Sequence, residues 1–280
     1  MQNTQDGPIT RRHLLAGAGA LAAVGLTGAP ALAALPAANM EAVVKAAQID
    51  PQRAGTALTP GARDSVLLVE RALVAKGLLA QQYVDGHFGS KTVEAYAAWQ
   101  RRLGYSGLGA NGLPGRTSLT RLGEGRFTLT RAIGPGARIT FRGKAVNERT
   151  RAMLLEAERL AGRTYGVTQG SYNPGGVGAS AGTHDGGGAL DLSVSGLTST
   201  QRTTAVRSLR RVGFAAWYRS PAEGPWNAHI HAIAISDTDL SSGAQSQVGD
   251  YYLGRNGLAS NGPDTGPQVT RVTWEEYRRA

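Results

Sequence analysis

Apolar residues recur at helical spacing in three stretches between residues 62 and 123. The first stretch begins at Asp64, has apolar residues three and four positions apart, and ends near Gly77. A second stretch covers Lys91–Leu103, and a third, shorter one covers Arg116–Leu122. The pattern predicts three helices joined by glycine-containing turns.

After residue 127 the pattern alternates between strands and helices. Asn147 is suited to cap an amphipathic helix that Gly162 ends, and the segment 198–201 fits a capping box before another helix. Strands are predicted at 138–142, 189–194, 214–218 and 228–235. Short connections between these elements favour an α+β domain over residues 127–280, with a mainly antiparallel sheet packed on one side by helices.

The chain before residue 62 shows no sustained periodicity. Residues 35–61 are rich in alanine and contain three prolines, so we predict a linker with a short helix near residues 40–47. Residues 1–34 resemble a twin-arginine export signal, because Arg11-Arg12 precede an Ala/Gly/Leu stretch that ends in an Ala-x-Ala site. The alternative is a membrane anchor, but the glycines make the stretch weakly hydrophobic. We therefore expect cleavage and no stable membrane insertion afterwards.

Composition narrows the chemistry of the 280-residue chain, whose length favours two domains. It has no cysteine, so any metal must be held by nitrogen and oxygen ligands. The net charge of +10 favours polyanionic partners, and for an exported protein the abundant polyanion is the cell wall. Nucleic-acid binding is not expected, because Arg207, Arg210 and Arg211 are more simply interpreted as the solvated face of a helix.

Three of the five histidines lie in two short clusters that can form a metal site. His184 precedes Asp191 by seven residues, and His229 and His231 lie on the same side of a predicted strand. The glycines at 186–188 allow the chain to fold His184 back beside the carboxylate. A catalytic zinc commonly takes three such ligands and leaves a fourth position for water. The residues therefore predict a site made by His184, Asp191 and one histidine of the pair.

The two clusters together resemble the zinc site of bacterial D-Ala-D-Ala metallopeptidases and related cell-wall endopeptidases. The matching pattern is His184-x-x-Gly187-x-Ala189-x-Asp191 followed by His229-x-His231. The resemblance implies that Zn²⁺ is bound by His184, Asp191 and His231. It also implies that His229 lies beside the metal as a base, proton shuttle or transition-state donor.

The chain departs from this family at three positions. The usual serine two residues before the first ligand is Gly182, and the arginine often found upstream is missing from residues 169–172. Some relatives use a catalytic glutamate three residues before the last ligand, where this chain has Ala228. Glu223 is the alternative catalytic residue if its loop folds inward, and we expect His229 rather than Glu223 to act.

The first helical region also resembles a known family. The ordered series Leu73, Gly77, Asp85-Gly86-x-Phe88-Gly89 and Asn111-Gly112 is similar to the small peptidoglycan-binding domain of wall hydrolases over residues 62–123. His87, in the first turn, is interpreted as a surface residue. The alternative is a three-helix spacer that binds no ligand.

Together these patterns predict a secreted or wall-associated zinc metallopeptidase that binds peptidoglycan. Its reaction would be hydrolysis of amide bonds in peptidoglycan peptides, as a D,D-carboxypeptidase or an endopeptidase. The alternative is a non-catalytic wall-binding protein with a degenerate zinc-peptidase fold. The cleaved bond, the oligomeric state and the role of residues 236–280 are not indicated by the sequence.

Overall fold

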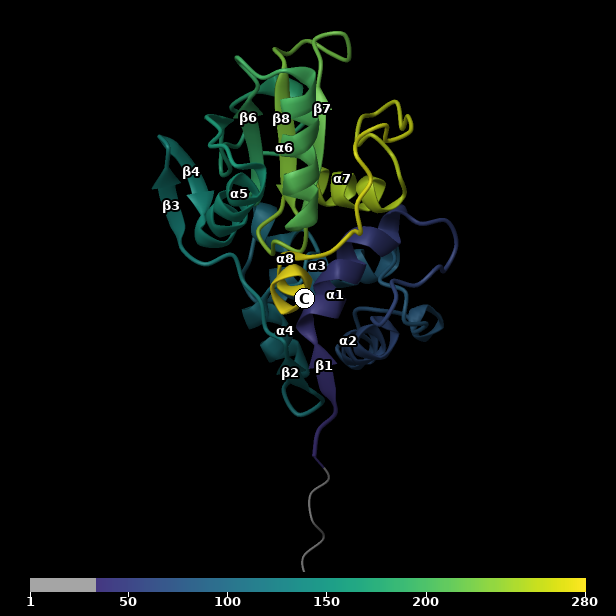
Figure 1. Ribbon diagram of the computed structural model, residues 1–280. Coiled ribbons are helices and arrows are strands. Elements are labelled where there is room, and N and C mark those ends of the chain that lie inside the picture. The colour runs from purple at the N-terminus through teal and green to yellow at the C-terminus, as the bar shows by residue number, and fades with distance from the viewer. Residues whose placement is uncertain (1–33) are drawn as a thin grey trace, which may run out of the picture. The chain divides into compact units, whose positions relative to one another are not determined.

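A computed structural model describes residues 34–280 (Figure 1). The export signal expected at residues 1–34 lies outside the described residues, apart from Ala34. Residues 35–280 form one compact unit of mixed helices and mostly antiparallel sheets, in agreement with the α+β prediction. Among the helices of this unit, none combines the length and the apolar character that crossing a membrane requires.

Four helices precede strand β2 (Thr128–Thr130). They are α1 (Met40–Ile49), α2 (Arg63–Ala75), α3 (Ser90–Arg102) and α4 (Arg116–Gly123), with 3-10 turns at Asp50–Gln52, Gln81–Tyr83 and Gly107–Ala110. Helices α2, α3 and α4 lie at the three predicted ranges. They belong to the same compact unit as the sheet, so a separate three-helix domain is not distinguished.

The segment expected to be a linker is packed into the fold. Its short helix forms as α1, capped by Asn39, whose side chain accepts from the N–H of Ala42. Met40, Val43 and Val44 are fully buried in a cluster shared with α2 and with the C-terminal part of the chain. The linker prediction missed this packing because the apolar face of α1 is only ten residues long and lies within an alanine-rich segment.

The larger sheet has four antiparallel strands in the order β5-β6-β8-β7. These strands are β5 (Val167–Gln169), β6 (Ala189–Ser193), β7 (Phe214–Arg219) and β8 (His229–Ala234). Smaller sheets pair β3 (Arg138–Phe141) with β4 (Lys144–Asn147), and β1 (Ala37–Asn39) with β2 (Thr128–Thr130). Strands β3, β6, β7 and β8 lie at the four predicted segments, whereas β4 and β5 were not predicted.

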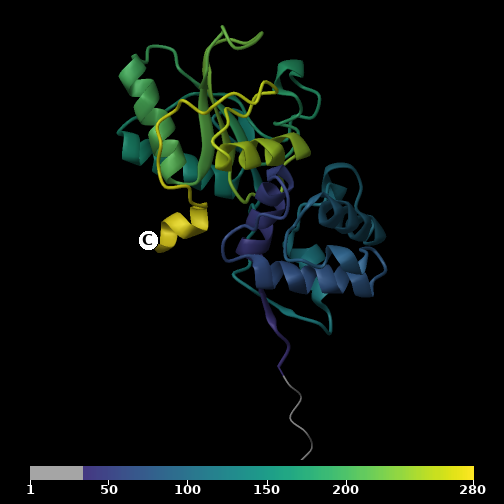
Figure 2. The same cartoon turned by 90° about the vertical axis from the view of Figure 1, so that its right-hand side faces the viewer.

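Helices cover both faces of this sheet. One face packs against α5 (Glu148–Ala161) and α6 (Ser199–Arg211), and the other packs against α7 (Ser242–Tyr252). Figure 2 shows α6 and α7 on opposite sides of the strands. The expectation of helices on one side was therefore incomplete, because α7 comes from a segment in which no motif was recognised.

The pleat of the strands sorts their residues between these two faces. Leu190, Leu192 and Ile230 are buried in the core beneath α5 and α6. Asp191 and His231 alternate with them and face the α7 side. The face toward α5 and α6 is apolar, whereas the face toward α7 combines apolar residues such as Ala189 and Ile233 with the polar residues that are available for chemistry.

One arginine of α6 contradicts the prediction of a solvated basic face. Arg207 and Arg211 are exposed, but Arg210 is 1% exposed. Its guanidinium forms a buried ion pair with Asp264 at 2.8 Å and donates to the backbone oxygen of Ala216. Arg210 therefore attaches the C-terminal segment to the sheet, which the sequence pattern alone did not reveal.

Candidate metal centre

Strand register brings two of the expected ligands side by side. In the antiparallel pair of β6 and β8, Asp191 lies opposite His231, and Ser193 lies opposite His229. On the other side of β8, Trp217 of β7 also lies opposite His231. Residues directly opposite each other on one face of a sheet have neighbouring side chains. The sheet therefore presents Asp191 and both histidines of the pair on one surface.

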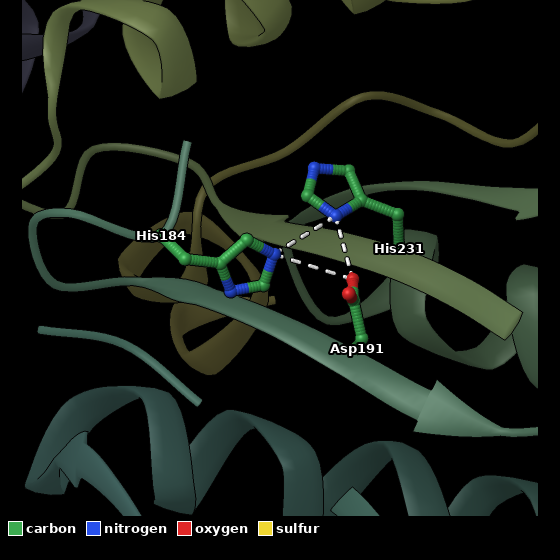
Figure 3. A group of neighbouring side chains, drawn as sticks. All are labelled: His184, Asp191 and His231. Atoms are coloured by element: carbon green, nitrogen blue, oxygen red, sulfur yellow. Dashed lines mark hydrogen bonds and ion pairs between the residues drawn. The ribbon is translucent and has the colours of Figure 1, made fainter. Parts of the chain in front are cut away.

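The third ligand comes from the glycine-rich loop before β6. A Cβ at Gly186 would collide with the carbonyl oxygen of Asp239 and lie 2.7 Å from the nitrogen of Ser241. Gly188 has a φ of +78°, which side-chain-bearing residues rarely adopt. The glycines therefore serve close packing as well as chain reversal. The loop places His184 over the end of β6, beside Asp191 (Figure 3).

The three side chains converge on one point (Figure 3). Oδ1 of Asp191 lies 2.8 Å from Nδ1 of His231 and 3.3 Å from Nε2 of His184. The two ring nitrogens are 3.4 Å apart. The residues are 1%, 6% and 9% exposed for His184, His231 and Asp191 respectively. This cluster can hold a metal ion.

Hydrogen bonds on the outer side of each ring determine which nitrogen faces the cluster. Nδ1 of His184 lies 2.8 Å from the carbonyl oxygen of Gly170, and Nε2 of His231 lies 2.9 Å from Oε1 of Gln247. Both oxygens accept, so the outer nitrogens carry the protons and the inner nitrogens carry lone pairs. The inner lone pairs face a carboxylate oxygen with no hydrogen between them. A cation at this point would satisfy all three acceptors.

The environment shifts the pKa values of two of the cluster residues. Burial raises the pKa of Asp191, but the imidazoles of His184 and His231, when protonated, donate to the carboxylate, outweigh burial and hold that pKa below its ordinary value. Burial lowers the pKa of His231 more than Asp191 raises it. The carboxylate is therefore ionised and the His231 imidazole is neutral near neutral pH, as metal ligands must be.

His229 lies next to the cluster without belonging to it. Its Nε2 is 3.8 Å from Oδ1 of Asp191, and its side chain is 17% exposed, more than those of the three cluster residues. Nδ1 lies 2.7 Å from the carbonyl oxygen of Asn227, so Nδ1 donates and Nε2 is left as an acceptor. The edge of His229 also meets Trp226 at 6.3 Å between ring centroids.

Glu223 is not brought to the cluster. It is exposed in the loop between β7 and β8, and its Oε2 accepts from the backbone N–H of Ser220 at 2.6 Å. It lines a different cavity from the one that contains His184 and His231. The loop folds with Glu223 outward, so the alternative catalytic residue lies away from the candidate ligands.

A cavity of about 750 Å³ lies against the cluster. The three residues of the cluster and the neighbouring His229 all reach its wall. Its other walls come from β5, from the loop before β6, from the loop between β7 and β8, and from the C-terminal segment; they include Gln169, Val177, Trp226 and Leu258. The cluster is thus accessible to a ligand of moderate size even though its members are buried.

A buried arginine also lines this cavity. Arg219 is 3% exposed, and its Nη1 donates to the carbonyl oxygen of Asn256 at 2.8 Å. Burial lowers its pKa to about 10. Among residues 34–280 no carboxylate lies within 4.0 Å of its guanidinium, and its Nη2 has no hydrogen-bond partner. The cavity wall therefore includes a buried cation that forms no direct ion pair within the described part of the protein.

The sequence did not identify the residues that orient the ligands. A Cβ at residue 170 would lie 2.5 Å from the backbone oxygen of Ala145. Only glycine therefore fits at the position whose carbonyl oxygen meets His184. Gln247 comes from a helix without a recognised motif. Arg219 had a weaker signal: it directly follows the predicted strand 214–218, and an extension of that strand by one residue places it on the same face as Trp217.

Comparisons with known proteins find no match for this chain, whether against protein-family models, curated proteins or solved structures.

Proposed function

We propose that this protein is a zinc-dependent peptidase that hydrolyses amide bonds in peptidoglycan peptides. The observation that carries the proposal is the convergence of His184, Asp191 and His231 beside a cavity that also contains His229. The resemblance of the two histidine clusters to cell-wall metallopeptidases supports the choice of reaction. The basic net charge of +10 supports an acidic polymer as partner.

The donor set favours zinc over harder cations. Two imidazoles and one carboxylate suit zinc, whereas magnesium and calcium prefer oxygen ligands. Zinc bonds of about 2.0–2.1 Å in a tetrahedral site place neighbouring ligand atoms about 3.3 Å apart. The two distances that His184 makes, 3.3 Å to Asp191 and 3.4 Å to His231, fit this spacing, and the third, 2.8 Å, is shorter.

When bound, zinc would act as a Lewis acid and lower the pKa of an attacking water towards 7. His229 has the position and the tautomer of a general base. Its unprotonated Nε2 accepts a proton from the water that attacks the amide carbonyl, and returns that proton to the departing amine. The carbonyl oxygen of Asn227 holds the other ring nitrogen and fixes the ring's direction.

The cavity walls are suited to a peptide rather than a bare ion. Trp226 and Leu258 provide apolar contact surface, and Gln169 provides a polar group. Arg219 adds a buried cation with an Nη2 donor left free by residues 34–280, which favours a substrate that carries carboxylates. Stem peptides of the cell wall have this character. We propose that the helices α2, α3 and α4 contribute wall binding, on the strength of their resemblance to peptidoglycan-binding domains.

The proposal is tested by digestion of purified peptidoglycan with the zinc-loaded protein. Soluble products are analysed by mass spectrometry, with a chelator-treated sample and His231→Ala as controls. Metal-dependent release of peptides or D-alanine, lost in His231→Ala, is expected, and the fragment masses identify the bond. Binding of zinc and wall material without any release contradicts the proposal and favours a non-catalytic wall-binding protein.

A further inference from the structure

A glutamine from the C-terminal part of the chain contacts the metal cluster from outside. Gln247 lies on α7, and its Oε1 is 2.9 Å from Nε2 of His231. The same side chain donates from its amide nitrogen to the carbonyl oxygen of Gly257 at 2.8 Å. Because that carbonyl can only accept, the amide nitrogen must face Gly257 and the amide oxygen must face His231.

We infer that Gln247 is a positioning residue that sets His231 to bind the metal through Nδ1. Its oxygen accepts the Nε2–H of His231 and leaves the lone pair on Nδ1, which points at Asp191 and His184. The opposite tautomer would place two acceptors, Nε2 and Oε1, against each other. The inference rests on the metal binding in the proposed function and is independent of the peptide bond that is cleaved.

The ring of His231 is restrained in two directions. Trp217 stacks on it with ring centroids 6.4 Å apart and planes 15° from parallel. Stacking limits tilting of the ring, but a half-turn flip about the Cβ–Cγ bond returns the ring to the same plane and keeps the stacking. The hydrogen bond to Gln247 opposes that flip, because the flip would place a carbon where Nε2 lies.

The position of Gln247 is fixed in turn by how α7 packs. Ser241 caps the helix by accepting from the N–H of Ala244 at 3.2 Å. A Cβ at Gly249, two residues after Gln247, would lie 2.8 Å from the backbone oxygen of Gln48 in α1. Helices α7 and α1 thus meet at a point where only glycine fits. The orientation of a metal ligand therefore depends on a helix from residues 40–49.

The test measures zinc affinity in the full chain by competition with a chromophoric chelator. Gln247→Met keeps the length of the side chain and removes the acceptor, and it is expected to weaken zinc binding about 10- to 100-fold. Gln247→Glu retains an acceptor oxygen and is expected to restore most of the affinity. Gln245→Met is the matched control, because Gln245 is a buried glutamine of the same helix that bonds to the Leu240 oxygen.

Unchanged zinc affinity in Gln247→Met overturns the inference, and so does an equal loss in Gln245→Met. If Gln247→Met does not fold, ¹⁵N NMR of His231 in the zinc-loaded wild-type protein decides: a proton on Nε2 supports the inference and a proton on Nδ1 overturns it. A protein that shows the Gln247 dependence but releases no peptide contradicts the proposed function alone. A wild-type protein that binds no zinc overturns both.

Discussion

Buried carboxylates and histidines occur together in two regions of this molecule, the helical region and the sheet, and their surroundings differ. In the helical region Asp50 is fully buried and accepts the hydroxyl of Thr59 at 2.6 Å and the N–H of Phe88 at 3.1 Å. His87, which was expected on the surface, is 8% exposed, and its Nδ1 lies 3.1 Å from the Ala57 oxygen. Both oxygens of Asp50 and Nδ1 of His87 thus meet complementary partners.

Glu70 in the same region follows the same rule. Its two oxygens accept from the N–H of Gly86 at 2.8 Å and from the hydroxyl of Thr92 at 3.2 Å. These bonds hold the Asp85-Gly86 turn against α2. The carboxylates of the helical region therefore stabilise turns, because donors occupy their acceptor atoms.

In the sheet the acceptors face one another instead. Asp191 is surrounded by ring nitrogens of His184 and His231 whose protons point outward to other partners. The comparison shows that burial of titratable residues does not by itself indicate a metal site. A metal site requires converging lone pairs that the protein leaves without donors.

The largest expected effect comes from removing a histidine of the sheet cluster, and the matched control removes a histidine of the helical region. His231→Ala should weaken zinc binding by more than about 100-fold, because loss of an outer hydrogen-bond partner alone typically costs 10- to 100-fold. His87→Ala should leave zinc affinity unchanged and lower the melting temperature. Chelator competition measures the zinc affinity of each variant, and thermal unfolding measures its melting temperature. A loss of zinc affinity in His87→Ala would show that the buried polar residues of the helical region and the cluster in the sheet are not independent.

The next effect concerns the histidine beside the cluster. His229→Ala should retain zinc and lower the rate of peptide release by about 10²- to 10⁴-fold, the usual contribution of a general base. Glu223→Gln should leave the rate unchanged, since Glu223 lies in another cavity. A rate loss in Glu223→Gln equal to that in His229→Ala would mean that the loop moves during the reaction.

A smaller effect should follow from removing the buried carboxylate of Asp50 in the helical region. Asp50→Ala leaves the buried donors of Thr59 and Phe88 without an acceptor and should lower the free energy of unfolding by about 2 to 3 kcal/mol. Chemical denaturation measures this change. The zinc affinity of the folded protein should stay at the wild-type value, and a decrease would contradict the separation of the two groups.

The smallest effect is a dependence of stability on pH. Burial raises the pKa of Glu70 from the ordinary 4.5 to about 7, against the opposing hydrogen bond from Gly86. The folded protein then keeps this proton up to about pH 7 while the unfolded chain releases it near 4.5, so stability falls as the pH rises between these values.

Glu70→Gln removes this dependence. Compared with wild type it should be more stable by about 2 kcal/mol at pH 8 and nearly equal in stability at pH 4.5. Denaturation midpoints of both proteins at the two pH values provide the measurement. Parallel pH profiles would show that Glu70 ionises normally in the folded state.

Much of the secondary structure was predictable because it depends on local pattern. Asn147 caps α5 through a bond to the N–H of Thr150, and Gly162 ends that helix with a φ of +63°. The capping box that begins at Thr198 also forms. Strand β5 was missed because it is three residues long and shows no alternation.

The sequence by itself determined which residue types could form the cluster and which of them would lie together. Histidine spacing put His229 and His231 on one face, and the glycines beside His184 indicated a close reversal of the chain. Both inferences follow from geometry that repeats over a few residues. Only the tertiary structure decided which ring nitrogen of His231 faces the cluster, because that depends on Gln247, sixteen residues away.

The same limit applies to α1, to Arg210 and to Arg219. The apolar face of α1 and the two arginines have partners far along the chain, in α7 and in residues 256–264. Side-chain periodicity tells which residues face inward, but it carries no information about which distant segment they meet. That pairing is fixed when the chain collapses and buried polar groups must find complementary partners.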